Sequence, residues 1–401
     1  MITSDFTIIG GGVVGLAAAL EMKQRYSDAS VLIIEKEERC GLHASGRNSG
    51  VLHAGFYYDA DSLKARFVRE GNRLMKEFCE ERKLPLNRCG KLVVARSEAD
   101  FAGLDELLRR GNANGVRLME VTEAEAREIE PRARTHVRAL YSPDTATVDP
   151  HTVVAEMAAE SERRGIRILT GARYLARAGK ALRTSAGEIG TGYTVNAAGL
   201  YADRIARDFG FGLDYRIVPF KGLYLYSSGS PGEFRACIYP VPDLGNPFLG
   251  VHITVGHAGQ AKIGPTAIPC LWREQYGGLQ GFSASEAADV GAGLLGLLRS
   301  GGTGFVRLAA GEIRKHSRRT LAAQAARLAT GIEATAFRRW GEPGIRAQLV
   351  RRGDRRLVMD FCLEGDEQSL HILNAVSPAF TCARAFAAYV ASEIEARTTA
   401  A

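Results

Sequence analysis

The sequence lacks the long apolar runs and cysteine patterns that mark membrane, secreted and zinc-binding proteins. Among its 401 residues the best apolar stretch, residues 290–298, is far shorter than the ~20 residues of a membrane-spanning helix. The seven cysteines are odd in number and show no CxxC spacing, which predicts reduced thiols and argues against a disulfide framework or a metal site. No signal-peptide pattern opens the chain, so we expect a cytoplasmic protein.

Nucleic-acid signatures are also missing, although the chain is basic. The formal charge is +7, and residues 305–356 alone hold thirteen Lys and Arg against four Asp and Glu. No aromatic RNA-binding pattern or zinc-finger spacing accompanies this segment, so a nucleic-acid partner is not expected. We interpret it as a solvated face, with an anionic membrane surface as the alternative. The 46% hydrophobic and 24% charged residues exclude a disordered chain.

The clearest motif is GGGVVG at residues 10–15, which matches GxGxxG. A β-prone segment at 5–9 precedes it, an Ala/Leu-rich helix is predicted at 16–26, and a second strand is predicted at 30–35. In such a β-α-β unit Gly10 permits the tight turn, Gly12 the approach of a pyrophosphate, and Gly15 close helix–strand packing. Glu35 ends the second strand, where a carboxylate accepts ribose hydroxyls. This predicts a dinucleotide site, and its N-terminal position favours FAD over NAD.

The rest of the chain does not continue as β-α-β units. Helices are predicted at residues 63–83, 101–114, 123–130, 151–164 and 377–394, with a helical lobe at about 283–330. Strands are predicted at 91–95, 166–169, 192–196, 217–226, 249–255 and 261–264, with two strands in 346–363 joined by a turn at 352–354. We therefore predict a mixed α/β (α+β) fold in which a Rossmann-like domain is interleaved with an antiparallel-sheet substrate domain. The first comprises residues 1–82, 150–213 and 340–401, and the second 83–149 and 214–339.

Four motifs together resemble a known family. GGGVVG, GRNSGVLHAG (46–55), GKLVVA (90–95) and VNAAGLYAD (195–203) are similar to segments of the FAD-dependent oxidoreductases related to D-amino acid oxidase. Residues 48–65, 240–254, 264–268, 344–348 and 372–381 resemble the L-2-hydroxyglutarate dehydrogenase/oxidase branch more closely. The matched segments run in order through nearly the whole chain.

The resemblance implies non-covalent FAD and places its contacts. The turns at 49–50 and 197–199 are expected along the flavin, and Ser377 and Pro378 are expected to cap and open a helix whose N-terminus faces the pyrimidine end of the ring. The expected cofactor-binding residues are Gly10, Gly12, Val13, Val14, Gly15, Glu35, Lys36, Ser45, Arg47, Asn48, Ser49, Gly50, Val51, Arg173, Ala197, Ala198, Gly199, Ser377, Pro378, Ala379, Phe380 and Thr381.

Oxidation of a 2-hydroxy acid requires a base for the hydroxyl proton and a cation for the carboxylate. His53, which follows the turn at 49–50, is our first choice of base and His252 the second. Arg346 in GIRAQ is expected to bind the substrate carboxylate, and Lys221 is our choice for the second cation that a diacid needs. Tyr58, Lys91, Thr266 and Thr381 are further substrate-binding candidates.

The implied reaction is oxidation of L-2-hydroxyglutarate to 2-oxoglutarate by hydride transfer to flavin N5. A quinone or another acceptor would take the electrons, with peripheral attachment to the inner face of the membrane as a hypothesis. Three alternatives stay open. They are a flavin amine or amino-acid oxidase of the glycine or sarcosine type or a glycerol-3-phosphate dehydrogenase-like enzyme, a non-catalytic FAD scaffold, and an NAD dehydrogenase.

Overall fold

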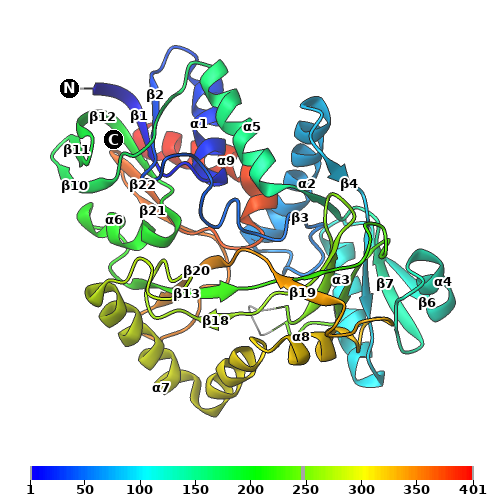
Figure 1. Cartoon of the computed structure of the whole chain (residues 1–401). Coiled ribbons are helices and arrows are strands. Elements are labelled where there is room, and N and C mark those ends of the chain that lie inside the picture. The colour runs from blue at the N-terminus through cyan, green and yellow to red at the C-terminus, as the bar shows by residue number, and fades with distance from the viewer. Residues whose placement is uncertain (1, 245–248, 400–401) are drawn as a thin grey trace.

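Two sheets organise the chain, one at the end that holds both termini and one at the opposite end (Figure 1). The computed structural model describes residues 2–399 except 245–248, and it describes the backbone but not the side chains of 301–308. Part of the motif at 240–254 therefore lies outside the described residues.

The first sheet has five parallel strands at its centre. Their order is β22 (Ser369–Asn374), β12 (Gly187–Asn196), β1 (Ile2–Ile9), β2 (Val31–Ile34) and β9 (Arg167–Leu169). Three antiparallel strands extend it, namely β10 (Tyr174–Ala178), β11 (Ala181–Thr184) and β21 (Cys362–Gly365). β1 lies between β2, the next strand in the chain, and β12, a later one. The chain therefore continues to opposite sides of β1, and the carboxyl end of β1 is the point where the strand order reverses. Such a switch point is where open α/β sheets bind ligands.

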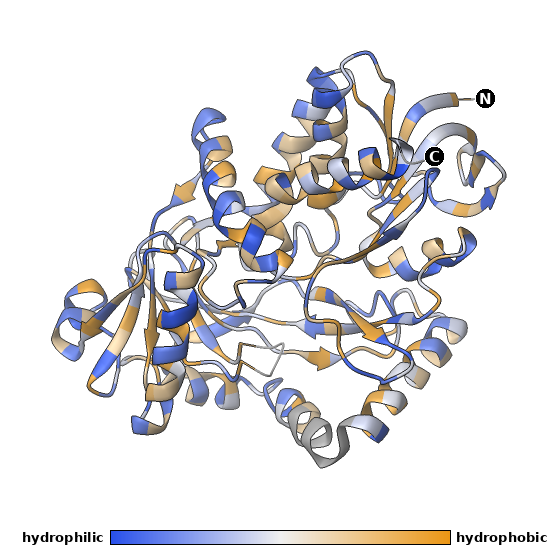
Figure 2. Ribbon diagram, turned by 180° about the vertical axis from the view of Figure 1, so that it is seen from behind, coloured by the Kyte–Doolittle hydropathy of each residue, from blue (hydrophilic) through white to orange (hydrophobic). Residues whose placement is uncertain are grey.

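Helices pack on both faces of this sheet. One face carries α1 (Val13–Arg25), α5 (Pro150–Arg163) and α9 (Ala379–Thr399), with α2 (Leu63–Glu81) against α9, and the other carries α6 (Ala202–Asp208). Local signals explain their starts, since the Ser62 hydroxyl caps α2 and the Asp149 carboxylate caps α5 ahead of Pro150. In Figure 2 the helices against the sheet carry mainly hydrophobic residues, with hydrophilic ones toward the periphery.

The second sheet has eight strands, of which only β15 and β5 pair in parallel. Its order is β19 (Phe337–Trp340), β14 (Leu225–Ser227), β17 (Ala261–Gly264), β16 (His252–Val255), β15 (Cys237–Pro240), β5 (Lys91–Val94), β7 (Arg138–Ser142) and β6 (Met119–Thr122). Its core includes residues of α3 (Phe101–Ala113), α4 (Glu123–Ile129) and α8 (Arg318–Ala325). The mixed α/β fold class is confirmed.

Two small sheets complete the fold. One contains β18 (Ile268–Pro269), β13 (Tyr215–Gly222) and β20 (Gly344–Arg351), and the other β3 (Val51–Leu52), β8 (Ala146–Val148) and β4 (Leu86–Asn87). The long helix α7 (Ala284–Arg314) packs on β13 and β18. Short 3₁₀ turns lie at Glu98–Asp100 and Gly199–Tyr201. β20, which we assigned to the first domain, pairs with β13 along its whole length, and the domain boundaries stay a prediction.

Two local predictions are wrong. Residues 346–363 do not form a strand pair, because after β20 the chain makes only a single bridge, Val350 to Leu357, and β21 pairs with β22. The last helix begins at Ala379, where the Pro378 carbonyl accepts the Cys382 N–H, so Pro378 stands just before the helix and Ser377 is not its cap. None of the helices in the described part of the chain combines the length and apolarity needed to cross a membrane.

Close packing of α2 on α9 depends on Gly71. A Cβ at this position would lie 2.4 Å from the Thr381 carbonyl oxygen and 2.7 Å from the Cys382 Cα. We expect Gly71→Ala to lower the free energy of unfolding by about 1–3 kcal/mol, because backbone atoms must move apart. Denaturant titration measures this. The control is Gly291→Ala in α7, where nothing lies within 4 Å, and which should raise stability by about 0.5–1 kcal/mol. Equal changes in the free energy of unfolding for Gly71→Ala and Gly291→Ala would contradict the packing argument.

Candidate active site

A cavity of about 950 Å³ opens beside the carboxyl end of β1. Its lining joins the turn between β1 and α1 to residues of β13, β16 and β20 and to the start of α9. The volume is at the upper end of the range for ligand pockets, which suits a large cofactor together with a small substrate.

Glycine is required where the backbone forms the cavity wall. Gly10 has a φ of +113°, and a Cβ there would lie 2.6 Å from the Ala197 carbonyl oxygen at the end of β12. A Cβ on Gly12 would lie 2.9 Å from the Ser45 hydroxyl, and one on Gly15 would lie 2.0 Å from the Gly10 carbonyl oxygen. Gly10 and Gly12 line the cavity, whereas Gly15 packs against the Gly10 backbone and does not line it. The role of Gly12 toward a pyrophosphate stays a prediction.

The same turn presents backbone N–H groups to an anion. Gly12 has no side chain to cap α1, and the backbone of Gly12 and Val14 at the start of the helix lines the cavity. The Ser45 hydroxyl accepts the Val13 N–H at 2.9 Å, which ties the loop after β2 to this turn. Glu35 accepts the Gly11 N–H at 2.7 Å, so its carboxylate is held beside the cavity where a ribose would lie. These donors and acceptors fit FAD.

Most of the predicted cofactor residues share this cavity. Only Gly15 and Gly50 do not line it. Gly50 acts through the backbone, since its φ is +74° and a Cβ there would lie 2.2 Å from the Val148 carbonyl oxygen. Those that line it are Gly10, Gly12, Val13, Val14, Glu35, Lys36, Ser45, Arg47, Asn48, Ser49, Val51, Arg173, Ala197, Ala198, Gly199, Ser377, Pro378, Ala379, Phe380 and Thr381. Their roles in binding stay predictions.

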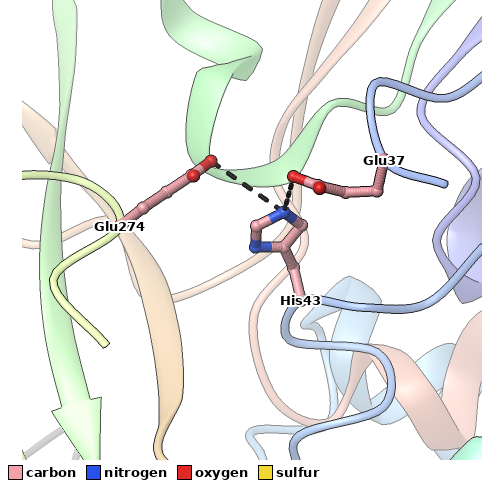
Figure 3. Close-up of side chains that lie close together, drawn as sticks. All are labelled: Glu37, His43 and Glu274. Carbon is pink, nitrogen blue, oxygen red and sulfur yellow. Dashed lines mark hydrogen bonds and ion pairs between the residues drawn. The ribbon is translucent and has the colours of Figure 1, made fainter. Parts of the chain in front are cut away.

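An ion cluster contributes Lys36, His43 and Glu274 to the cavity lining, and Figure 3 shows His43 with its two carboxylates. His43 lies between two carboxylates, with its Nε2 2.9 Å from Glu37 and 3.9 Å from Glu274. The Lys36 ammonium contacts both carboxylates, at 2.6 Å for Glu274. Although burial raises it, hydrogen bonds from Lys36 and His43 lower the pKa of Glu37 to about 2. The lysine thus supplies the positive charge for these acids, and the cluster ties the segment at 270–276 to the loop after β2.

Both predicted histidines line the cavity and are buried. Burial and the neighbouring Lys91 hold the pKa of His53 well below its ordinary value and lower that of His252 to about 3. Both rings are therefore neutral at neutral pH. His252 stacks on Tyr239, and its Nδ1 lies 3.0 Å from the Gly250 carbonyl oxygen. Since a carbonyl only accepts, Nδ1 of His252 carries the proton and Nε2 is left as the acceptor.

The predicted cations lie in different places. Arg346 lines the cavity, and burial lowers its pKa to about 10. Lys221 does not line it, because side chains alternate along β13 and its neighbours Phe220 and Gly222 face the cavity. Lys91 does not line it either. Its ammonium is enclosed by aromatic rings, 4.2 Å from the centroid of Tyr239.

Tyr58, Thr266 and Thr381 line the cavity as predicted, whereas several other lining residues were missed. Tyr57, Lys64, Tyr224 and Tyr239 belong to it, and of these Tyr57 and Lys64 lie inside the motif at 48–65. Periodicity gave no reason to single out Lys64, since a lysine in the first turn of a helix is ordinarily exposed. Its side chain is buried here, and only the tertiary structure shows this.

Comparisons with known proteins agree with this geometry. A family model described as FAD dependent oxidoreductase matches residues 5–393. The L-2-hydroxyglutarate dehydrogenase of Salmonella houtenae is 34% identical, covering 98% of this chain and 93% of its own length. The mitochondrial L-2-hydroxyglutarate dehydrogenase of Homo sapiens is 33% identical, covering 98% and 89%.

Solved structures share the fold. L-alpha-glycerophosphate oxidase from Mycoplasma pneumoniae, solved with FAD bound, has a TM-score of 0.77 at 20% identity and covers 98% of this chain and 95% of its own. Glycine oxidase from Geobacillus kaustophilus has a TM-score of 0.72 at 20% identity and covers 99% and 96%.

Substitution at Gly10 tests the cofactor site. We expect Gly10→Ala to weaken FAD binding at least tenfold, about 1.4 kcal/mol, because the methyl group meets the Ala197 carbonyl and the φ is unfavourable. Titration of the apoprotein with FAD, followed by absorbance, measures this. Gly165→Ala is the control, since that glycine has a φ of +78° but nothing within 4 Å, and it should bind FAD normally. Unchanged binding by Gly10→Ala would contradict the assignment.

Proposed function

We propose that this chain, which belongs to the family of FAD dependent oxidoreductases, oxidises L-2-hydroxyglutarate to 2-oxoglutarate. The observation that carries the proposal is the similarity over nearly the full length to proteins named L-2-hydroxyglutarate dehydrogenase, at 32–35% identity. The chemistry of the cavity supports it, because a half-buried arginine suits a carboxylate and neutral histidines suit a proton to be removed.

FAD bound in this cavity supplies the two-electron acceptor for the hydrogen on C2 of the substrate. The protein must then take the hydroxyl proton as the C–O bond becomes a carbonyl. We assign this to His53, which follows the turn at 49–50 and whose backbone N–H is held by the Thr381 hydroxyl at 3.1 Å. The tautomer of His252, with Nε2 free to accept a proton, makes that residue the second candidate.

Arg346 binds the C1 carboxylate in this proposal. Its Nε donates to the Gln348 side chain at 3.1 Å, which restrains the guanidinium, and burial increases the benefit of pairing it with an anion. A carboxylate fixed there orients C2 for reaction and brings negative charge toward the histidines, which favours their protonated form as the proton is transferred.

The anaerobic absorbance spectrum of the purified protein tests the function directly. L-2-hydroxyglutarate should bleach the flavin band, whereas D-2-hydroxyglutarate, glycine, sarcosine and glycerol 3-phosphate should not. Bleaching by an amine instead would move the assignment to the amine or amino-acid oxidases. An unchanged band with every compound would indicate a non-catalytic FAD protein.

Asparagine substitutions identify the base. We expect His53→Asn to lower kcat about 10²–10⁴-fold in anaerobic stopped-flow reduction, because asparagine cannot accept the proton, and His252→Asn to lower it less. The reverse order would assign the base to His252. Because the pKa of the base is depressed, it stays neutral as the pH falls through 6.5, so kcat/KM should decline only at more acidic pH. A midpoint at or above pH 6.5 would contradict a buried histidine base.

We further propose a membrane-dissolved quinone as the final electron acceptor. The support is a set of exposed residues: Arg351, Arg352 and Arg355 at and just after the end of β20, and the apolar Leu295 and Leu298 of α7. The two segments touch, since the Ser300 hydroxyl donates to the Arg355 carbonyl at 3.3 Å. Cations beside apolar side chains favour an anionic bilayer surface.

Vesicle co-sedimentation checks this attachment. We expect the protein to sediment with vesicles of anionic lipid at low salt, to be released by about 0.5 M salt, and not to bind neutral vesicles, because the attraction is electrostatic. Replacing Arg351, Arg352 and Arg355 together by glutamine should abolish binding. Absence of salt-sensitive binding would remove the membrane part of the proposal and leave the oxidation of substrate untouched.

A further inference from the structure

Lys64 stands out among the cations that line the cavity. It belongs to the first turn of α2 and its side chain is buried, with 5% of the residue exposed. Within the described part of the chain its Nζ makes no hydrogen bond or ion pair, and it lies 5.9 Å from the centroid of the Tyr58 ring. A lysine is almost never buried in this way without a partner.

Most other lysines and arginines of the cavity have partners. Four contact carboxylates of the protein, namely Lys36 with Glu37 and Glu274, Arg110 with Asp59 and Glu106, Arg204 with Glu286, and Lys315 with Glu312. These pairs are structural, because each lysine or arginine already has its counter-ion. Arg47 donates to the Leu42 carbonyl and lies over the Tyr276 ring, and Arg173 is exposed to solvent. Lys64 differs from them because the residue is buried and its ammonium has neither a hydrogen bond nor a carboxylate within ion-pair distance among the described residues.

Three features make the position of Lys64 electrostatically unfavourable in the absence of an anion. Burial and the nearby positive charge of Arg346 lower the pKa of Lys64 to about 7. The residue also lies at the N-terminus of α2, where the helix dipole disfavours a cation. The Asp360 carboxylate offsets part of this, but its oxygens accept the backbone N–H groups of Leu63 and Lys64 at 2.7 and 3.0 Å and so cap the helix.

We propose that Lys64 binds the distal carboxylate of a dicarboxylic substrate while Arg346 binds the carboxylate next to the reacting carbon. This inference rests on the proposed function and replaces Lys221 as the second cation. Lys64 and Arg346 both line the cavity, and the charge of Arg346 acts on both Lys64 and Tyr58. The Lys64 Nζ lies 5.9 Å from the centroid of the Tyr58 ring. A dianion that bridges them removes the repulsion between the two cations and supplies the counter-ion that Lys64 lacks.

The proposal makes Lys64 a determinant of specificity. A monocarboxylate bound at Arg346 leaves the buried Lys64 without an anion, whereas a dicarboxylate of the right length reaches both side chains. The discrimination is strong because the unpaired charge stays in a buried site. The chain therefore should select substrates by a second carboxylate and not by size alone.

Ligand binding without turnover tests this. The spectrum of the FAD-loaded protein is titrated with glutarate and with pentanoate, which have the same carbon chain and differ by one carboxylate. The wild type should bind glutarate at least about tenfold more tightly, and Lys64→Met should bind the two within about threefold of each other. Lys64→Arg should restore most of the preference, because it retains the charge. Lys221→Met, outside the cavity, should behave as the wild type.

Several results would overturn the proposal. One is a wild type that binds glutarate and pentanoate equally, and another is a Lys64→Met variant that retains the preference for glutarate. A third is a Lys64→Met variant that binds both ligands more weakly by the same factor, which would indicate that Lys64 interacts with the cofactor. FAD content and circular dichroism establish that each variant is folded. In turnover, Lys64→Met should raise KM for L-2-hydroxyglutarate at least tenfold with a smaller change in kcat. If L-2-hydroxyglutarate does not reduce the wild type, the proposed function fails, while the comparison of glutarate with pentanoate still decides the role of Lys64.

Discussion

The close approach of backbone at the turn between β1 and α1 is the constraint on which the site depends. The Gly10 backbone lies against the Ala197 carbonyl, and Glu35 accepts the Gly11 N–H, so three parallel strands converge where no side chain fits. Ser45 fastens the following loop to the same turn through the Val13 N–H. These contacts place N–H donors and a carboxylate along one wall of the cavity. The cavity itself results from the way the strands and the following loop pack around this turn.

Another part of the cavity lining has a different electrostatic character. Lys64 and the two histidines are buried and Arg346 is half-buried, and desolvation shifts the pKa of each toward the neutral form. Such a lining is unfavourable when empty and becomes favourable when it meets negative charge. It therefore suits an anionic substrate whose reaction releases a proton.

Much of this could be predicted from the chain. The GxGxxG turn, Glu35, the fold class and the family follow from local motifs whose geometry is set within a few residues, and His53, His252 and Arg346 lie in the cavity as expected. The errors have physical causes. Lys221 was misplaced because its strand alternates sides at that point, and Lys91 because an aromatic enclosure cannot be read from GKLVVA. The pairing of β21 with β22 depends on contacts between distant segments.

By itself the sequence determined the β-α-β unit and the residue types available for chemistry, because glycine conformations, helix caps and hydrophobic periodicity act over short distances. Only the tertiary structure decided which charges lack partners. Lys64 and Lys36 are both lysines near predicted element ends, yet Lys36 contacts two carboxylates and Lys64 has none within ion-pair distance among the described residues. Segments far apart in the chain determine how deeply a charged residue is buried and whether it has a partner. Burial and pairing in turn decide whether that residue stabilises the fold or is suited to bind a ligand.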